Sequence, residues 1–364
     1  MILNNKIIDP LKELLLSGNK NLTSFQKLNE LLKINHHSPT SASMPLGIYV
    51  FRYLQSTQLQ RREFEGNSNM MSGVVCGDAL ADHYSNKIWS MHPIRKKLAP
   101  RDHNKLSKDE AIAKALEKFK EYVPVNEKDQ EKKDRYLETI ASTIQQGFLA
   151  LDSLGINNSN DVVAEDSINH VDKRLALPIV GRTDLHFKIQ SKKNKVFHDD
   201  EQFSSVVSPP GGSILSDLVI FELKTTWDKP GKVKKSGDRS FSSARLPVLP
   251  SRLHLQQLAF YVKAKSSTYN ISPLLCYLTA DGYKLFTKDN CTDLEPENLN
   301  NYYEQLVQNC IRKERLLARH IDLDEPEMIL KEIIKDVDPE FNHPFYWSIG
   351  NKHLTRAKKI WSNT

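Results

Sequence analysis

The order of the strand-like segments between residues 160 and 290 constrains the fold more than any other feature of the sequence. Three segments rich in β-branched and aromatic residues come first, with the sequences DVVAED, LALPIVGRTDLHFKI and LVIFELKTT. A helical segment, RLHLQQLAFYVKAK, follows with Leu255, Leu258 and Val262 on one stripe, and PLLCYLTA and YKLFTK then return to the strand pattern. Three strands, one helix and two further strands predict an α/β domain.

Helical patterns flank this segment on both sides, and most of the first 155 residues have sequence patterns typical of helices. SKDE at 107–110 is a capping box in which Ser107 and Glu110 bond to each other's backbone, and a second helix is expected over about 131–154. Its apolar residues recur every three or four positions, at Tyr136, Ile140, Ile144, Phe148 and Leu151. The pattern is helical again over 298–320 and 326–337. We therefore expect helical N- and C-terminal extensions around the α/β core.

The length and composition exclude several protein classes. The 364 residues are enough for one large domain with additions, and no apolar run approaches the roughly 20 residues of a membrane-spanning helix. The first 18 residues lack a basic leader and contain Asp9 and Glu13, which argues against a presequence. We expect a soluble monomer, not bound to a membrane, in the cytoplasm of a bacterial or virus-infected cell; a mitochondrial location is disfavoured.

The positive charge of the chain is concentrated in one segment. The net charge is +6, which by itself is weak evidence for a polyanionic partner. The segment KPGKVKKSGDRSFSSAR, residues 229–245, has six basic residues against the single acid Asp238, and its Gly, Ser and Pro content predicts a loop. This loop is either solvated or in contact with phosphate, and the candidate contacts are Lys232, Lys234 and Lys235.

The stretch VIFELKTTW, residues 219–227, places two charges inside an apolar strand. Glu222 and Lys224 point to one face of this strand, because side chains alternate, while Phe221 and Leu223 point to the other. A same-face ion pair at the end of a sheet is the simplest explanation. A metal site is the alternative, and it requires a second carboxylate, because a hard divalent cation binds several oxygens. Asp184, in GRTDL on the preceding strand, lies beside Glu222 if the two strands pair.

These residues resemble a known nuclease signature. The motifs G181-R-T-D184, E222-L-K224 and Q257-L-A-F-Y261 occur in the order typical of PD-(D/E)XK nucleases of the RecB-like branch, which have G-x-x-D, (D/E)-x-K and Q-x-x-x-Y motifs. Within that branch the chain is most similar to the mitochondrial genome maintenance exonuclease group and its viral and bacterial relatives. The resemblance covers residues 160–290. It implies a restriction-endonuclease-like core, in which a central mixed sheet is flanked by helices.

Two features depart from the family pattern. RecB-like enzymes commonly have a helical histidine four residues after a glycine as a further metal ligand, whereas CGDALADHY separates Gly77 from His83 by six. His83 is still our candidate for that ligand, and a surface histidine is the alternative. Some relatives hold an iron–sulfur cluster, but the cysteines here are too widely spaced for one, and we expect none: Cys76, Cys276, Cys291 and Cys310.

The resemblance implies roles for the site residues. Asp184, Glu222 and the backbone carbonyl of Leu223 would ligate one or two Mg²⁺ or Mn²⁺ ions, and Lys224 would stabilise charge on the phosphate. Gln257 and Tyr261 lie on one helical face, where they would hold a phosphate or orient the metal cluster; a buried polar pair is the alternative. Candidates for nucleic-acid contacts are Arg182, Arg252 and His254, although Arg182 can equally pair with a local acid. Glu165 is interpreted as the partner of a basic neighbour.

From these residues we expect a metal-dependent DNA exonuclease that acts on single-stranded ends in replication, recombination or repair. A structure-specific endonuclease of the same fold and a catalytically silent module that binds nucleic-acid ends are the alternatives. The expected domains are a helical extension over 1–70, the nuclease core over 71–290 with a helical insertion at about 100–155, and a helical extension over 291–364.

Overall fold

The computed structural model describes most of the chain between residues 34 and 319. The described residues are 34–49, 67–91, 98–124, 126–156, 161–188, 217–233 and 239–319, with isolated positions after residue 331. Among these residues no helix is both long and apolar enough to cross a membrane.

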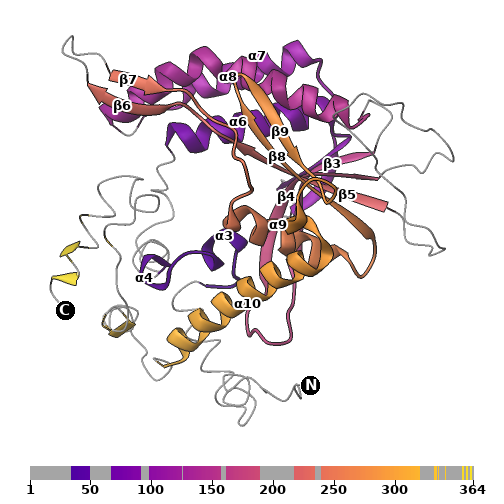
Figure 1. Cartoon of the computed structure of the whole chain (residues 1–364), viewed down its shortest axis with the longest axis vertical. Coiled ribbons are helices and arrows are strands. Elements are labelled where there is room, and N and C mark those ends of the chain that lie inside the picture. Colours follow the sequence, from indigo (N-terminus) through magenta and orange to yellow (C-terminus); the bar gives the residue numbers. More distant parts are fainter. Residues whose placement is uncertain are drawn as a thin grey trace. The chain divides into compact units, whose positions relative to one another are not determined.

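A seven-stranded mixed sheet forms the centre of the fold (Figure 1). Its strands lie in the order β2-β1-β3-β4-β5-β8-β9. Strand β5 pairs antiparallel with β4 and parallel with β8, and β8 pairs antiparallel with β9. The bounds are β1 Lys87–Met91, β2 Leu98–Asp102, β3 Val162–His170, β4 Ile179–Lys188, β5 Asp217–Thr225, β8 Asn270–Thr279 and β9 Gly282–Phe286. The sheet with its flanking helices confirms the α/β prediction and is consistent with a restriction-endonuclease-like core.

Two pairs of strands lie where the sequence predicted other structure. Strands β1 and β2 fall within the first 155 residues, which were expected to be mostly helical. The expectation missed them because such short strands gain their stability from neighbouring strands more than from their own pattern. Strands β6 (Lys229–Val233) and β7 (Arg239–Ser242) form a separate two-stranded sheet where a loop was expected. Pro230 lies in β6, and a two-stranded sheet has only edge strands, in which proline is tolerated.

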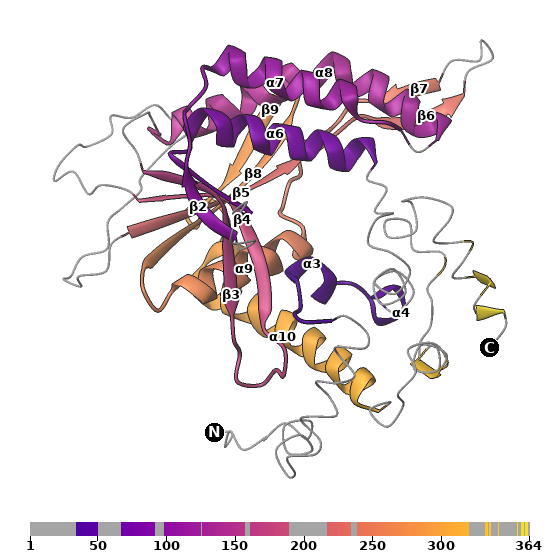
Figure 2. The same cartoon turned by 180° about the vertical axis from the view of Figure 1, so that it is seen from behind.

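Three helices cover one face of the sheet, namely α6 (Ser68–Tyr84), α7 (Lys108–Glu121) and α8 (Glu127–Ser153) (Figure 2). The capping box of α7 is present, since the Ser107 hydroxyl accepts from the Glu110 N–H and the Glu110 carboxylate accepts from the Ser107 N–H at 2.8 Å. Helix α8 begins four residues before the predicted start, at an Asn126 cap. Both helical predictions are confirmed.

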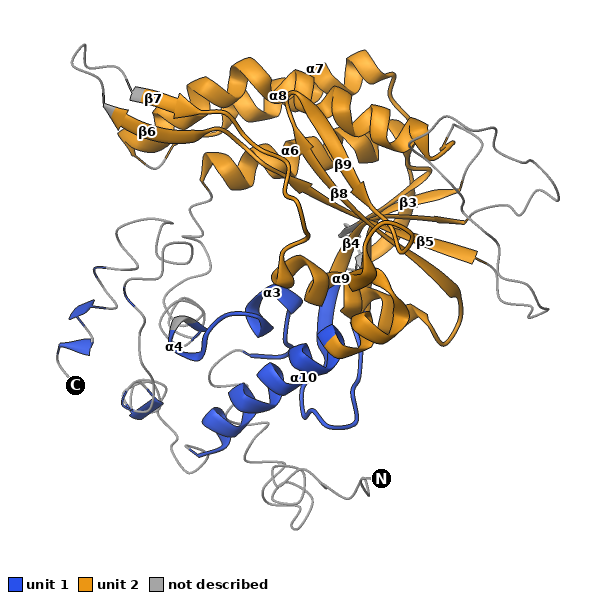
Figure 3. Cartoon of the chain, viewed as in Figure 1, with its two compact units in different colours: residues 1–66, 169–181, 302–364 blue, residues 67–168, 182–301 orange. Residues whose placement is uncertain are grey.

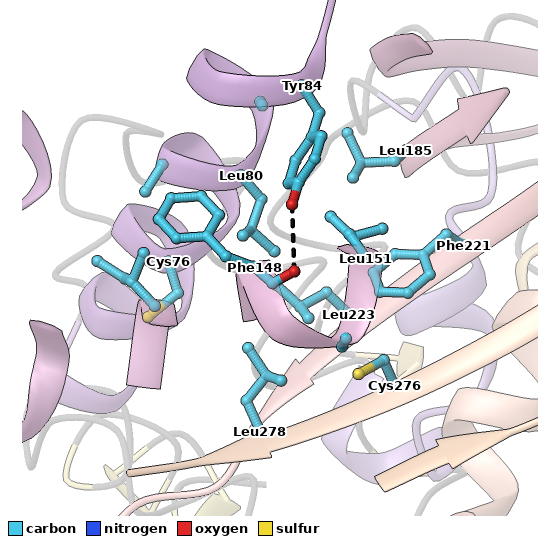
Figure 4. Close-up of a cluster of buried hydrophobic side chains, with 14 of the residues drawn as sticks. Cys76, Leu80, Tyr84, Phe148, Leu151, Leu185, Phe221, Leu223, Cys276 and Leu278 are labelled. Atoms are coloured by element: carbon cyan, nitrogen blue, oxygen red, sulfur yellow. Dashed lines mark hydrogen bonds between the residues drawn. The ribbon is translucent and has the colours of Figure 1, made fainter. Parts of the chain in front are cut away.

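The hydrophobic core lies between these helices and the sheet (Figure 4). Strand β5 contributes Val219, Phe221 and Leu223 to this core, and β4 contributes Leu185 and Phe187. Because side chains alternate along a strand, the residues between them face the other side of the sheet. This alternation places Asp184 and Glu222 on the face opposite to the core.

Helix α9 (Arg252–Lys265) covers that second face (Figures 1 and 2). The Ser251 hydroxyl caps it by accepting from the His254 N–H. Its buried side chains include Leu255, Leu258 and Tyr261. The face that α9 covers therefore also has Asp184 of β4 with Glu222 and Lys224 of β5.

The chain divides into two compact units (Figure 3). Unit 2 comprises residues 67–168 and 182–301 and includes most of the sheet with α6 to α9. Unit 1 comprises residues 1–66, 169–181 and 302–364, and includes the short helices α3 (Pro39–Ala42) and α4 (Leu46–Ile48) and most of α10 (Pro296–Ala318). The predicted boundaries near residues 70 and 290 stay a prediction, because most residues of the expected extensions lie outside those described.

Candidate active site

The β4–β5 pairing brings the two predicted carboxylates together. Leu185 lies opposite Phe221, so the next pair along the two antiparallel strands is Asp184 and Glu222. The Leu223 N–H donates to Asp184 Oδ2 at 2.6 Å, which fixes the Asp184 side chain against β5. The long segment between the two strands, residues 189–216, lies outside the described residues.

Lys224 completes the charged cluster. Its Nζ donates to Glu222 Oε1 at 2.6 Å, so the ion pair considered from the sequence is present. The Glu222 side chain is 0% exposed and the Lys224 side chain is 18% exposed. Glu222 Oε2 is also buried, yet it has no hydrogen-bond partner within the described residues. A single lysine thus faces two carboxylates. The Asp184 N–H lies close enough to the Glu222 carboxylate to oppose the rise of its pKa, but the buried Oε2 makes no hydrogen bond within the described residues.

The pKa values of this cluster reflect burial and mutual repulsion. Burial, followed by the negative charge of Asp184, raises the pKa of Glu222 to about 8. Burial also raises the pKa of Asp184, against the opposing effects of Lys224 and the Leu223 N–H. Burial alone would lower the pKa of Lys224, but the two carboxylates outweigh it and the pKa is raised. Lys224 is therefore charged, and a cation next to the carboxylates would relieve their repulsion.

The donor set fits a hard divalent cation in part. Two neighbouring carboxylates with one unsatisfied buried oxygen are the oxygen ligands that Mg²⁺ and Mn²⁺ prefer. Within the described part of the chain, no group of three His, Cys, Asp or Glu side chains is arranged to hold a metal. Remaining ligands would have to come from backbone carbonyls such as that of Leu223, from water or from substrate.

His83 is not grouped with the two carboxylates. Its Nδ1 lies 2.8 Å from the carbonyl oxygen of Leu106, and its ring centroid lies 5.1 Å from that of Phe148 at an edge angle. These contacts tie His83 to neighbouring helical and loop structure on the side of α6 and α8. Its predicted role as a ligand receives no geometric support.

Gln257 and Tyr261 form a hydrogen-bonded chain that ends on β4. Gln257 Nε2 donates to the Tyr261 hydroxyl at 2.9 Å, and that hydroxyl donates to the carbonyl oxygen of Arg182 at 2.5 Å. Tyr261 is buried. The geometry favours the buried polar pair considered from the sequence, and its effect is to fix the β4 backbone two residues before Asp184.

Glu165 lies on β3 with an unusual backbone. Its φ of 55° is in the left-handed region, which non-glycine residues seldom adopt. Ala164 belongs to the hydrophobic core, whereas Asp166 Oδ2 lies 2.7 Å from Lys265 Nζ of α9, so the positive φ reverses the alternation of β3. Glu165 Oε2 lies 3.9 Å from Arg182 Nη1, which confirms the predicted basic partner. Burial and the charge of Asp184 raise the pKa of Glu165 to about 7.

The candidates for nucleic-acid contacts differ in their exposure to solvent. Arg182, Lys232 and Arg252 are exposed, while His254 is half-buried in the first turn of α9. Lys234 and Lys235 lie outside the described residues.

Two hydrogen bonds anchor the base of the β6–β7 hairpin, close to the end of β5. Asp228, three residues after the end of β5, accepts from Arg135 Nε of α8 at 2.8 Å and from the Ala244 N–H at 2.8 Å. These two bonds hold both ends of the hairpin together and against α8. No local pattern indicates this anchor, because Arg135 and Asp228 are 93 residues apart in the sequence.

Tyr277 of β8 is a further residue of the site that sequence analysis did not identify. It pairs with Lys224 in the parallel register of β5 and β8. Its sequence context, PLLCYLTA, is that of an ordinary buried strand. Only the strand register shows that this tyrosine lies beside Lys224.

The comparisons with known proteins add little to this geometry. No protein-family model and no curated protein matches the sequence. A solved structure named "Crystal structure of SSO0001" aligns with 54% of this chain and 83% of that chain, at 16% sequence identity and a TM-score of 0.23. Similarity at this level identifies neither a fold nor a function.

Proposed function

We propose that this chain is a metal-dependent deoxyribonuclease that hydrolyses phosphodiester bonds from the ends of single-stranded DNA. One observation supports the hydrolytic site above all others. The buried Oε2 of Glu222 lacks a partner among the described residues, while Asp184 is its neighbour and Lys224 bonds its other oxygen. A buried carboxylate oxygen without a partner is costly unless a ligand completes its bonds.

Asp184, Glu222 and the carbonyl of Leu223 would hold the cation. A bound Mg²⁺ or Mn²⁺ supplies positive charge that polarises a phosphate and lowers the pKa of an attacking water. The protein holds both carboxylates ready for it, because the Leu223 N–H orients Asp184 and the Lys224 ammonium orients Glu222.

Lys224 would act on the phosphate and on the water. Its raised pKa keeps it protonated at neutral pH, and its bond to Glu222 Oε1 fixes the position of the ammonium. A point charge at this place favours a hydroxide nucleophile and stabilises the negative charge that develops on the phosphorus oxygens.

DNA contacts would come from the basic residues around the site. The β6–β7 hairpin begins four residues after the end of β5, has the exposed Lys232 and is anchored to α8 through Asp228. A single strand that reaches Lys224 would pass this hairpin. A preference for free ends is part of the proposal and comes from the resemblance to RecB-like exonucleases.

The proposal is tested by digestion of end-labelled oligonucleotides with and without Mg²⁺. We expect the wild type to cleave only with Mg²⁺ or Mn²⁺, and Lys224→Ala to lose at least about a hundredfold in rate. Lys188→Ala is the matched control, because Lys188 is an exposed lysine at the far end of β4. DNA that is bound but not cleaved by the wild type would support the silent binding module instead.

A second substrate tests the requirement for ends. Linear and circular single-stranded DNA of equal length are digested side by side with Mg²⁺. An exonuclease degrades the linear strand and leaves the circle intact, whereas equal cleavage of the circle would support the endonuclease alternative.

A further inference from the structure

Tyr277 connects the charged cluster of Asp184, Glu222 and Lys224 to the first turn of α9. In the parallel β5–β8 register Tyr277 lies beside Lys224, so both side chains project from the same face of the sheet at a strand spacing of about 4.8 Å. The Tyr277 side chain is buried, and its hydroxyl lies next to Ser251 and His254 at the start of α9.

The hydrogen bonds of this hydroxyl define the state of the His254 ring. The Ser251 N–H donates to the Tyr277 oxygen at 3.1 Å, and His254 Nδ1 lies 2.7 Å from the same oxygen. A backbone N–H can only donate, so the tyrosine oxygen accepts there and its one proton is available to the acceptor Nδ1. In the opposite arrangement, with Nδ1–H as donor, the Tyr277 proton would have to go to the Ser251 hydroxyl, which also bonds to Tyr277 and already accepts from the His254 N–H. The arrangement with Tyr277 as donor to Nδ1 leaves the ring hydrogen of His254 on Nε2.

The environment keeps this ring neutral. Burial and the positive charge of Lys224 lower the pKa of His254 to about 3, so the imidazole is uncharged at neutral pH. The side chain is half-buried, and no partner for Nε2 is present among the described residues. The packing of the two rings, with centroids 5.5 Å apart, restricts rotation of the histidine.

We propose that Tyr277 is a positioning residue that fixes His254 as a neutral Nε2–H donor to a non-bridging oxygen of a DNA phosphate next to the one at Lys224. This inference rests on the proposed function and adds a second phosphate subsite to it. A neutral donor suits this place because a second cation would repel Lys224 and compete for the carboxylates. The directional hydrogen bond from His254 Nε2–H to the phosphate would also hold the DNA strand on the α9 side of the sheet.

The tautomer is tested without substrate. Long-range ¹H–¹⁵N spectra of protein with ¹⁵N-labelled histidine report which ring nitrogen is protonated. We expect the Nε2–H form for His254 in the wild type and a mixture of tautomers in Tyr277→Phe. Tyr283→Phe removes a hydroxyl from the neighbouring strand β9 and should leave the His254 signals unchanged. An Nδ1–H tautomer in the wild type would overturn the proposal.

The phosphate contact is tested by binding, so that it does not depend on cleavage. Fluorescence anisotropy with Ca²⁺ in place of Mg²⁺ measures the affinity for single-stranded oligonucleotides that contain one uncharged methylphosphonate linkage at successive positions. His254→Ala should weaken binding of ordinary DNA about tenfold, the loss expected for one hydrogen bond to a charged acceptor. His254→Gln, which keeps an amide donor near the Nε2 position, should restore part of it.

When the methylphosphonate replaces the phosphate that His254 contacts, wild type and His254→Ala should bind the oligonucleotide with equal affinity. If the difference persists at every position, His254 and Tyr277 have only a structural role and the proposal is wrong. Wild-type binding without cleavage in Mg²⁺ would leave the contact standing and refute the hydrolase. Absence of wild-type binding would refute both.

Discussion

Buried charged side chains occur in both compact units, but their hydrogen-bonding needs are met to different degrees. In unit 1, Glu314 accepts from the Ala176 and Leu177 N–H groups, and its Oε1 lies 3.0 Å from His37 Nε2. Lys313, next to it, donates to the carbonyl oxygens of Ser41 and Ala42. These charges are enclosed by partners from the chain itself.

The cluster of unit 2 is different. Glu222 is as fully buried as Glu314, but one of its oxygens has no partner within the described residues, and its nearest neighbours include a second carboxylate. Both carboxylates are equally buried, so burial does not distinguish them, whereas the number of hydrogen bonds that each one accepts does. From this difference we infer that the unit 1 charges stabilise the fold and that the unit 2 charges serve the cation site of the proposed function.

The largest expected effect is on activity. Glu222→Gln keeps the size of the side chain and removes its charge, so the nuclease rate should fall by about a thousandfold or more while the unfolding free energy falls by no more than about 1 kcal/mol. Oligonucleotide digestion and urea denaturation of the same preparation measure the two quantities. A large loss of stability would show that Glu222 is structural, like Glu314.

The opposite result is expected in unit 1. Glu314→Gln removes the charge that His37 and the two backbone N–H groups face, and should cost about 3 to 5 kcal/mol of unfolding free energy. Urea denaturation monitored by tryptophan fluorescence measures it. If this variant were as stable as Glu222→Gln, the distinction between the two regions would fail.

The pH dependence of stability sharpens the same contrast. Folding raises the pKa of Glu222 from 4.5 to about 8, so the folded protein binds this proton more tightly than the unfolded chain does. This contribution is fully present below pH 4.5 and is lost as the pH rises toward 8.

In EDTA, the unfolding free energy should therefore fall by roughly 2 to 4 kcal/mol between pH 5 and pH 8, and Glu222→Gln should remove most of this slope. Addition of Mg²⁺ should flatten it too, since a cation favours the ionised carboxylate. An equal slope in wild type and variant would exclude Glu222 as its source.

The smallest expected effect concerns the hydrogen-bonded chain on α9. Tyr261→Phe leaves the Arg182 carbonyl oxygen without its donor and should cost about 1 to 2 kcal/mol of stability. We expect nuclease activity to fall about tenfold through displacement of Asp184, with little change in DNA affinity. Tyr283→Phe, on β9, should change neither. A selective loss of DNA affinity in Tyr261→Phe would instead indicate a direct phosphate contact.

Local patterns in the sequence predicted much of the fold and the centre of the site. The capping box at Ser107, the stripe of α8 and the alternation of β5 depend on nearby residues, and all three are present in the structure. The position of Asp184 beside Glu222 followed from one antiparallel pairing. The cap, the stripe and the alternation could be predicted because each is determined by short-range spacing, whereas the Asp184–Glu222 neighbourhood depended on the expected pairing of two strands.

Other features depend on contacts that are distant in sequence. Strands β1 and β2 are stabilised by neighbours in the sheet, and the β6–β7 hairpin by the bond between Asp228 and Arg135. Tyr277 reaches the site only through the register of β8 against β5, and the positive φ of Glu165 turns Asp166 toward Lys265. Contacts of this kind, between residues far apart in the sequence, cannot be predicted from local patterns.

The central claim is that Asp184 and the unsatisfied Glu222 oxygen form a cation site. Titration of Mn²⁺ followed by electron paramagnetic resonance measures this directly, with neither DNA nor catalysis involved. We predict that the wild type binds Mn²⁺, that Glu222→Gln binds it at least about tenfold more weakly, and that Lys188→Ala binds it like the wild type. Equal Mn²⁺ affinity in wild type and Glu222→Gln, or no binding by either, would contradict the account.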